Sequence, residues 1–246
     1  MTRHWDFYQC QIDDAPASIF LDLRFEHETR PPHATTLFRI RVQMLDPDEH
    51  GMGTASEATA FNALEDDVVT RATAAQLSYV GRIRSGAIWE LVFYGGPEAK
   101  DALEVLRKVF VDRRTYVDMR PDPDWGYYRD FLLPDDERRE WMEDRKVVEA
   151  LADHGDSLAI PRRIDHWIYF ATAEARDQFI AEATQRGFAV EDTGEREGEL
   201  PFVVQLHRVD SATLDHIHEV VMELFELATS VGGEYDGWES PALTTH

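Results

Sequence analysis

Residues 231–239, Val-Gly-Gly-Glu-Tyr-Asp-Gly-Trp-Glu, constrain the fold more than any other segment of the chain. Three glycines and two aromatic residues in nine positions suit neither a regular helix nor an ordinary strand, because glycine adds no side chain to packing and loses much conformational entropy on folding. The segment follows a strongly amphipathic helical pattern. It predicts a closing strand with a special backbone conformation, in which Tyr235 and Trp238 act as rigid anchors of a contact.

The length and composition indicate a folded globular protein. The 246 residues are enough for one large or two small domains, and 43% of them are hydrophobic. No apolar run approaches the roughly 20 residues that a membrane span needs, and the first residues lack the apolar core of a secretory signal. Cys10 is the single cysteine, which excludes an internal disulfide and a cysteine-built metal site. We therefore expect a soluble cytoplasmic protein.

The charge of the chain limits its partners. There are 48 acidic and 25 basic residues, which give a formal net charge of −23. Residues 1–135 hold 23 acidic and 15 basic side chains, a net of −8, and residues 136–246 hold 25 and 10, a net of −15. Such a chain repels phosphate backbones, so we expect no direct binding of nucleic acid. The excess of carboxylates serves either solubility or the recognition of a basic protein.

The first part of the chain predicts an α+β domain, with helices packed on one face of an antiparallel sheet in the order βββαββαβ. The predicted strands are residues 5–12, 17–25, 36–44, 77–84, 87–94 and 115–119, and the predicted helices are 56–75, with Ser56 as its N-cap, and 97–110. Trp125, Tyr127 and Tyr128 follow a Pro-Asp-Pro-Asp break and are expected to fix the connecting segment onto this domain. We place the domain boundary near residue 135, which gives domains 1–135 and 136–246.

The second part predicts a leading helix at residues 136–154 and then the order βαββαβ. The predicted strands are residues 163–170, 187–192, 201–208 and 234–238, and the predicted helices are 173–186 and 211–231. This order is typical of a ferredoxin-like domain, in which both helices cover one face of the sheet and leave the other open.

The first predicted strand of the second domain places aromatic rings on that open face. Ile164, Ile168 and Phe170 alternate with Trp167 and Tyr169, so packing of the aliphatic set against the helices leaves the other two outside. Open-face aromatics are typical of platforms for single-stranded RNA, but the negative charge contradicts that function. The rings are instead expected to be covered by the leading helix, by the first domain or by a protein partner.

The last predicted helix carries an acidic stripe beside its apolar stripe. This arrangement indicates either a solvated face or a face that receives a basic protein. The predicted partner-binding residues combine this stripe with the open-face and closing-strand residues: Trp167, Tyr169, Asp215, Glu219, Glu223, Glu226, Tyr235, Asp236 and Trp238.

Catalytic and metal-binding patterns are weak. His216 and His218 are two residues apart on a predicted helix and point in different directions, so we expect no metal site. No nucleophile motif or phosphate-binding glycine loop occurs, and no cofactor is expected. An enzymatic alternative places a small-molecule or hydrolytic site around Arg82, Glu65 and Asp124. That alternative requires the three to converge in one pocket, and a structural ion pair is the simpler interpretation.

The residues also resemble two known families. Over about residues 137–239 the chain resembles the regulator of ribonuclease E activity B family, through His154-Gly-Asp156, the segment 161–170, Gly187-Phe188 and the closing segment 232–239. The first half looks like the family called domain of unknown function 695, on motifs at residues 5–8, 65–66, 79–82, 93–94 and 122–128. The first resemblance implies a ferredoxin-like, non-enzymatic protein that binds ribonuclease E or a related nuclease and lowers its activity. A self-associating structural module is the remaining alternative.

Overall fold

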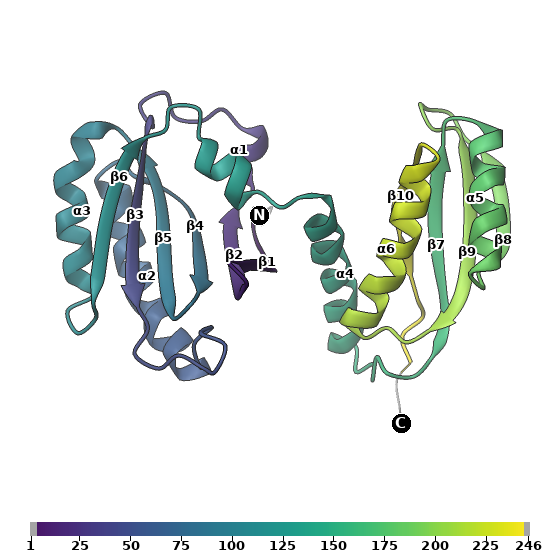
Figure 1. Cartoon of the computed structure of the whole chain (residues 1–246), viewed down its shortest axis with the longest axis horizontal. Helices are drawn as coiled ribbons and strands as arrows, with labels where there is room; N and C mark the ends of the chain where they lie inside the picture. Colours follow the sequence, from purple (N-terminus) through teal and green to yellow (C-terminus); the bar gives the residue numbers. More distant parts are fainter. Residues whose placement is uncertain (1–3, 244–246) are drawn as a thin grey trace. The chain divides into compact units, whose positions relative to one another are not determined.

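The computed structural model describes residues 4–243 and divides the chain into two compact units, residues 1–138 and 139–246 (Figure 1). Each unit contains one antiparallel sheet together with helices, so both are α+β. In the described part of the chain, no helix combines the length and the apolar character that crossing a bilayer requires.

The first unit is built on a six-stranded antiparallel sheet with the strand order β1-β2-β4-β5-β3-β6. Its strands are β1 (Trp5–Ile12), β2 (Ala15–Asp22), β3 (Thr36–Gln43), β4 (Ser78–Ser85), β5 (Ile88–Gly95) and β6 (Thr115–Pro121). Its helices are α1 (Arg24–His27), α2 (Ala55–Ala74) and α3 (Lys100–Leu106), with the short turns η1 (Pro97–Ala99), η2 (Arg107–Val109) and η3 (Tyr128–Leu132). The short helix α1 replaces the predicted end of the second strand.

The N-terminus of α2 differs from the prediction. Thr54 is the N-cap, and its side chain accepts a hydrogen bond from the backbone N–H of Glu57. Ser56 lies inside the first turn, where its hydroxyl donates to Asp46. The prediction of Ser56 as the cap is wrong because both hydroxyl residues suit a cap, and the loop before the helix decides which one takes that position.

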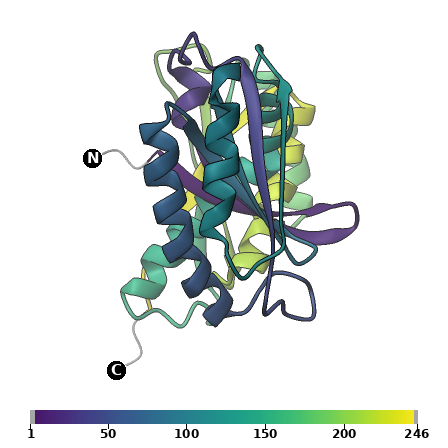
Figure 2. The ribbon, with the colours of Figure 1, turned by 90° about the vertical axis from the view of Figure 1, so that its left-hand side faces the viewer.

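Helices α2 and α3 cover one face of this sheet, as Figure 2 shows from that side. Phe61 of α2 stacks on Trp89 of β5, with ring centroids 4.3 Å apart, and both rings are fully buried. Alternate residues of β3 and β5 supply the sheet side of this core, because side chains on a strand point to opposite faces in turn.

The segment 122–133 packs on the opposite face of the same sheet. Trp125 stacks on Tyr94 with ring centroids 4.0 Å apart, and its indole N–H donates to the carbonyl of Ala34 at 2.7 Å. The Tyr128 hydroxyl donates to the carbonyl of Asp22 at 2.7 Å. These contacts confirm that the aromatic residues after the Pro-Asp-Pro-Asp break fix this segment onto the first unit.

The second unit holds a four-stranded antiparallel sheet with the strand order β10-β7-β9-β8. Its strands are β7 (Arg162–Phe170), β8 (Ala189–Glu195), β9 (Phe202–Asp210) and β10 (Gly233–Glu239), and its helices are α4 (Asp136–Asp153), α5 (Ala173–Gln185) and α6 (Leu214–Ser230). Helix α4 begins three residues before the first residue of the unit. After α4 the order is βαββαβ, as the periodicity predicts.

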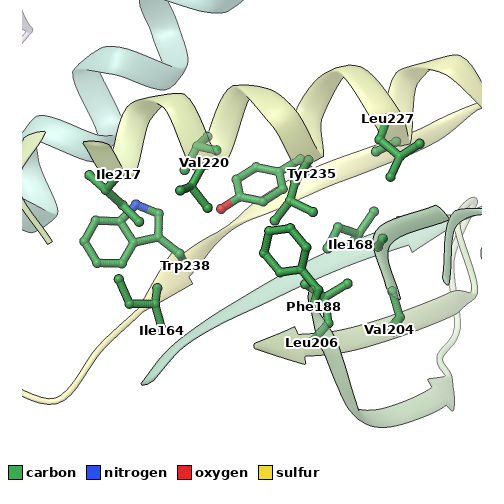
Figure 3. Close-up of a cluster of buried hydrophobic side chains, with 14 of the residues drawn as sticks. Ile164, Ile168, Phe188, Val204, Leu206, Ile217, Val220, Leu227, Tyr235 and Trp238 are labelled. Carbon is green, nitrogen blue, oxygen red and sulfur yellow. The ribbon is translucent and has the colours of Figure 1, made fainter. Parts of the chain in front are cut away.

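The core of the second unit lies between its sheet and the helices α5 and α6. Figure 3 shows the part of this core that lies under α6. Ile164, Ile168 and Phe170 of β7 are fully buried in it, and the residues between them are partly or fully exposed except His166. The predicted inward set of β7 is therefore confirmed, with His166 as an unpredicted member.

We expect the substitution Tyr128→Phe to lower the free energy of unfolding by about 1–2 kcal/mol, because the carbonyl of Asp22 loses a buried hydrogen-bond donor. Urea denaturation of the full chain measures this change. The matched control is Tyr116→Phe, since Tyr116 is 47% exposed and its loss of a hydroxyl should change stability by less than about 0.5 kcal/mol. Equal losses in both variants would show that the Tyr128 bond does not anchor the segment.

Candidate functional site

Helix α6 separates an apolar face from an acidic one. Ile217, Val221 and Leu224 are buried, whereas three of the predicted acidic residues, Asp215, Glu219 and Glu226, are exposed. The helix therefore presents three carboxylates to solvent.

The fourth predicted acidic residue, Glu223, behaves differently. It is partly buried, its Oε2 lies 3.2 Å from Nη1 of Arg208, and its Oε1 lies 3.7 Å from Nη1 of Arg186. Glu223 is therefore paired within the second unit, because β9 and the end of α5 bring arginines to it.

The closing strand β10 contains a β-bulge that explains its unusual sequence. Tyr235 lies opposite Ile168 and Trp238 lies opposite His166, and the register shifts between Tyr235 and Gly237. Residues three apart on a regular strand point to opposite faces, but the extra residue of a bulge restores them to the same face. Gly237 has a φ of 136°, a conformation that is essentially restricted to glycine.

As a result, Tyr235 and Trp238 point into the core, where they are 6% and 8% exposed (Figure 3). The Tyr235 hydroxyl lies 2.9 Å from Nδ1 of His166, and the indole N–H of Trp238 donates to Oδ1 of Asp144 on α4 at 2.8 Å. The expectation that the closing strand presents these two rings on its surface is therefore wrong. The bulge turns them inward and leaves Asp236 exposed.

Trp167 and Tyr169 lie on the face of the sheet opposite the core and are partly exposed. The Tyr169 hydroxyl accepts a hydrogen bond from Nη1 of Arg196 at 2.6 Å, and the Arg196 guanidinium also lies 5.3 Å from the Tyr169 ring centroid. Contacts within the second unit thus cover part of the open face.

A groove runs between α4 and β10 in the second unit. It has a volume of about 350 Å³, in the lower range of small-ligand pockets. Carboxylates and aromatic residues share its lining, and among residues 4–243 no basic residue contributes to it. The lining residues are Glu140, Glu143, Asp144, Val147, Trp167, Tyr235, Asp236, Gly237, Trp238 and Glu239. The structure therefore brings four of the predicted partner-binding residues, Trp167, Tyr235, Asp236 and Trp238, to one place.

Two buried groups beside the groove have displaced pKa values. Burial lowers the pKa of His166 to about 3, so its ring is neutral at physiological pH. Burial, reinforced by the nearby Asp144 carboxylate, raises the pKa of Tyr235 well above its usual range. The hydrogen bond between these two side chains thus joins two neutral groups.

Asp144 is buried, with an exposed fraction of 2%, and the sequence analysis did not predict this position. Besides the Trp238 indole, it is bonded to Nδ1 of His218 on α6 at 2.8 Å. Asp144 stands among other charged residues on α4, so no local pattern distinguishes it from its neighbours.

Asp156 and Arg162 form a second unpredicted contact, a buried ion pair in which Nη2 of Arg162 lies 2.8 Å from Oδ1 of Asp156. The hydrogen bonds from Arg162 hold the pKa of Asp156 well below its usual range. Both residues lie in the motifs on which the resemblance to the ribonuclease regulators rests, and those motifs were the available signal.

Arg82 forms an ion pair within the first unit. Its Nη1 lies 2.5 Å from Oε2 of Glu65, and Glu65 also accepts a hydrogen bond from the Tyr79 hydroxyl at 2.6 Å. Asp124 is exposed, and its carbonyl accepts a hydrogen bond from Arg30. Arg82 thus makes the structural ion pair that the sequence favoured. Among residues 4–243, no cluster of three or more His, Cys, Asp or Glu side chains could hold a metal ion.

The bulge generates a prediction about stability. Gly237→Ala should lower the free energy of unfolding by about 1–3 kcal/mol, because an alanine cannot adopt a φ of 136° without strain. Asp236→Ala is the matched control in the same bulge and should cost less than about 0.5 kcal/mol, since Asp236 is exposed. Chemical denaturation followed by tryptophan fluorescence measures the stability of both variants. Equal stability of Gly237→Ala and Asp236→Ala would contradict the requirement for glycine in the bulge.

His166 generates a prediction about pH. Between its unfolded pKa of 6.5 and its folded pKa of about 3, the unfolded chain binds a proton that the folded chain excludes. The free energy of unfolding should therefore fall as the pH falls through this window, by up to about 1.4 kcal/mol per pH unit from this residue. His166→Gln should make the measured dependence shallower by about one proton, whereas His27→Gln, at a side chain 83% exposed, should not. An unchanged slope in His166→Gln would contradict the neutral buried ring.

Comparison with solved structures yields distant likenesses. A crystal structure of a candidate glycine cleavage system transcriptional repressor is 10% identical and matches over 84% of this chain and 98% of its own, with a TM-score of 0.26. An unknown protein from Galdieria sulphuraria is 9% identical over 82% of this chain and 96% of its own, with a TM-score of 0.22. These TM-scores are too low to carry an argument about fold or function. No curated protein matches the chain significantly.

Comparison with family models identifies both parts of the chain. Residues 141–240 match the family described as regulator of ribonuclease activity B. Residues 3–133, more than half of the chain, match the family of unknown function DUF695. The chain therefore belongs to the DUF695 family, and its second part matches the regulators of ribonuclease activity B.

Proposed function

We propose that this protein is a non-catalytic regulator whose acidic second domain binds a basic protein and lowers the activity of a ribonuclease E-type endoribonuclease, and so modulates RNA turnover in the cytoplasm. The match of residues 141–240 to a family of ribonuclease regulators carries the proposal. The net charge of −15 over residues 136–246 supports it, because a nuclease that handles RNA uses basic segments that an acidic surface complements.

The exposed carboxylates of α6 form the first part of the proposed contact surface. Asp215, Glu219 and Glu226 share one side of the helix and extend from its first turn to its last. Long-range attraction from such a surface accelerates encounter with a basic partner and weakens with added salt. Glu223 contributes less, since Arg208 and Arg186 already neutralise it.

The proposal includes the domain plan. We assign residues 1–135 and 136–246 to separate domains, supported by the start of α4 at Asp136. We classify the second domain as ferredoxin-like. Its βαββαβ order and its strand order β10-β7-β9-β8 support this class, because the first and third strands of the domain are central and its last and second strands lie at the edges.

The test starts with affinity capture of partners from a lysate of the protein's own host at low and at high salt. A ribonuclease captured at low salt and released at high salt is then purified, and its cleavage of RNA is measured with and without the full-length protein. We expect the protein to slow cleavage. A captured ribonuclease whose rate is unaffected by a saturating amount of the protein would contradict the proposal.

Charge reversal on α6 then tests the contact surface. The triple variant Asp215→Lys, Glu219→Lys and Glu226→Lys should weaken binding by about tenfold or more and reduce its dependence on salt. Glu223 is kept so that its pairs with Arg208 and Arg186 survive.

The matched control reverses three exposed carboxylates at and beyond the end of β8, Glu195→Lys, Glu197→Lys and Glu199→Lys, which changes the net charge by the same amount. It should weaken binding by less than about threefold, because these residues lie off the proposed surface. Equal losses from both triple variants would contradict the assignment of the contact to α6.

A further inference from the structure

The groove between α4 and β10 differs from the rest of the acidic surface because aromatic rings form part of its wall. We propose that it binds an arginine side chain of a basic protein segment. This inference rests on the proposed function, since it names what the basic partner inserts and where. Arginine fits such a lining better than lysine does, because its planar guanidinium stacks on aromatic faces and binds carboxylates with two hydrogen bonds.

The rings are held in place before any partner arrives. Trp238 is fixed by its hydrogen bond to Asp144, and Tyr235 by its bond to His166. Trp167 lies opposite Gly237 in the strand register. The two buried rings thus form a fixed inner wall, and Trp167, which is partly exposed, is the ring on which a guanidinium stacks.

Gly237 lines the groove and is the register partner of Trp167. A Cβ at this position would meet nothing within 4 Å, so the space next to Gly237 is open. A larger residue would both strain the backbone and project into this space. The glycine thus serves the bulge and the groove together.

Of the five carboxylates of the groove, Glu140, Glu143 and Asp144 already have partners, and Asp236 and Glu239 are available. Asp144 already accepts hydrogen bonds from Trp238 and His218, and Glu143 forms an ion pair with Lys146 at 2.7 Å. Asp236 and Glu239 are exposed, and neither forms an ion pair within residues 4–243.

The bulge decides where these two available carboxylates stand. Asp236 is the bulged residue that leaves the ladder, and Glu239 lies opposite Asp165 at the end of the strand. Glu239 pairs with Asp165 and so shares with Trp167 the face of the sheet opposite the core, where an arginine that stacks on the Trp167 ring can also reach a carboxylate. A cationic ligand with a flat apolar face is what this combination recognises.

Isothermal titration of the full-length protein tests the inference. The probe is a peptide of alternating arginine and glycine, and its control is the same peptide with citrulline in place of arginine, which keeps the shape and removes the charge. We expect the arginine peptide to bind and the citrulline peptide to bind at least about tenfold more weakly, because hydrogen bonds between charged groups are the stronger ones.

Two matched double variants and one single variant locate the binding. The double variant Asp236→Asn with Glu239→Gln should raise the dissociation constant by about tenfold. The control double variant, Glu197→Gln with Glu199→Gln, changes the net charge by the same amount and should raise the dissociation constant by less than about twofold. Trp167→Leu changes no charge and should also weaken binding several-fold, since it removes a stacking surface. Thermal melting confirms that each variant is folded.

The inference is overturned if the two carboxylate pairs weaken binding equally, or if Trp167→Leu folds and binds as the wild type does. The same variants in the RNA-cleavage assay separate it from the proposed function. If all variants slow the nuclease as the wild type does and the groove variants leave peptide binding unchanged, the groove is refuted and the regulatory function stands. Peptide binding that depends on the groove, with no effect on the nuclease, would refute the regulatory function and leave the arginine site standing.

Discussion

The β-bulge at Asp236 and Gly237 is the constraint on which the second unit depends. Without the extra residue, Tyr235 and Trp238 would point to opposite faces of the sheet, and one of these two rings would leave the core. With it, both rings are buried, and their polar atoms find partners in His166 and Asp144. Glycine is required at position 237 because the strand turns there through a conformation that other residues avoid.

Asp144 extends this constraint to the helices. It accepts hydrogen bonds from Trp238 of β10 and from His218 of α6, and so ties α4 to two other elements of the unit. A buried carboxylate is costly unless its oxygens are bonded, so α4 is held in one position along β10. The groove exists because of that position, with one wall from α4 and the other from β10.

The two units treat the faces of their sheets differently. In the first unit, α2 and α3 cover one face and the aromatic segment around Trp125 and Tyr128 packs on the other. In the second unit, α5 and α6 form the core on one face, and Trp167 and Tyr169 on the opposite face stay partly exposed. The second unit, in which one face of the sheet stays partly exposed, is thus also the part of the chain with the larger negative net charge.

The sequence by itself determined the order of strands and helices in the second unit, the inward positions of Ile164, Ile168 and Phe170, and the anchoring role of Trp125 and Tyr128, because side-chain periodicity and turn residues are local properties of a chain. It did not predict α1, which replaces the end of the second predicted strand. It also indicated that the closing strand is unusual, since its glycines serve no other purpose. Tertiary structure alone decided that Tyr235 and Trp238 are buried, that Glu223 is paired, and that Asp144 is a buried acceptor. Each of these depends on a partner brought from another element, 94 residues away for Asp144 and Trp238, and no local pattern records which residues the folded chain brings together.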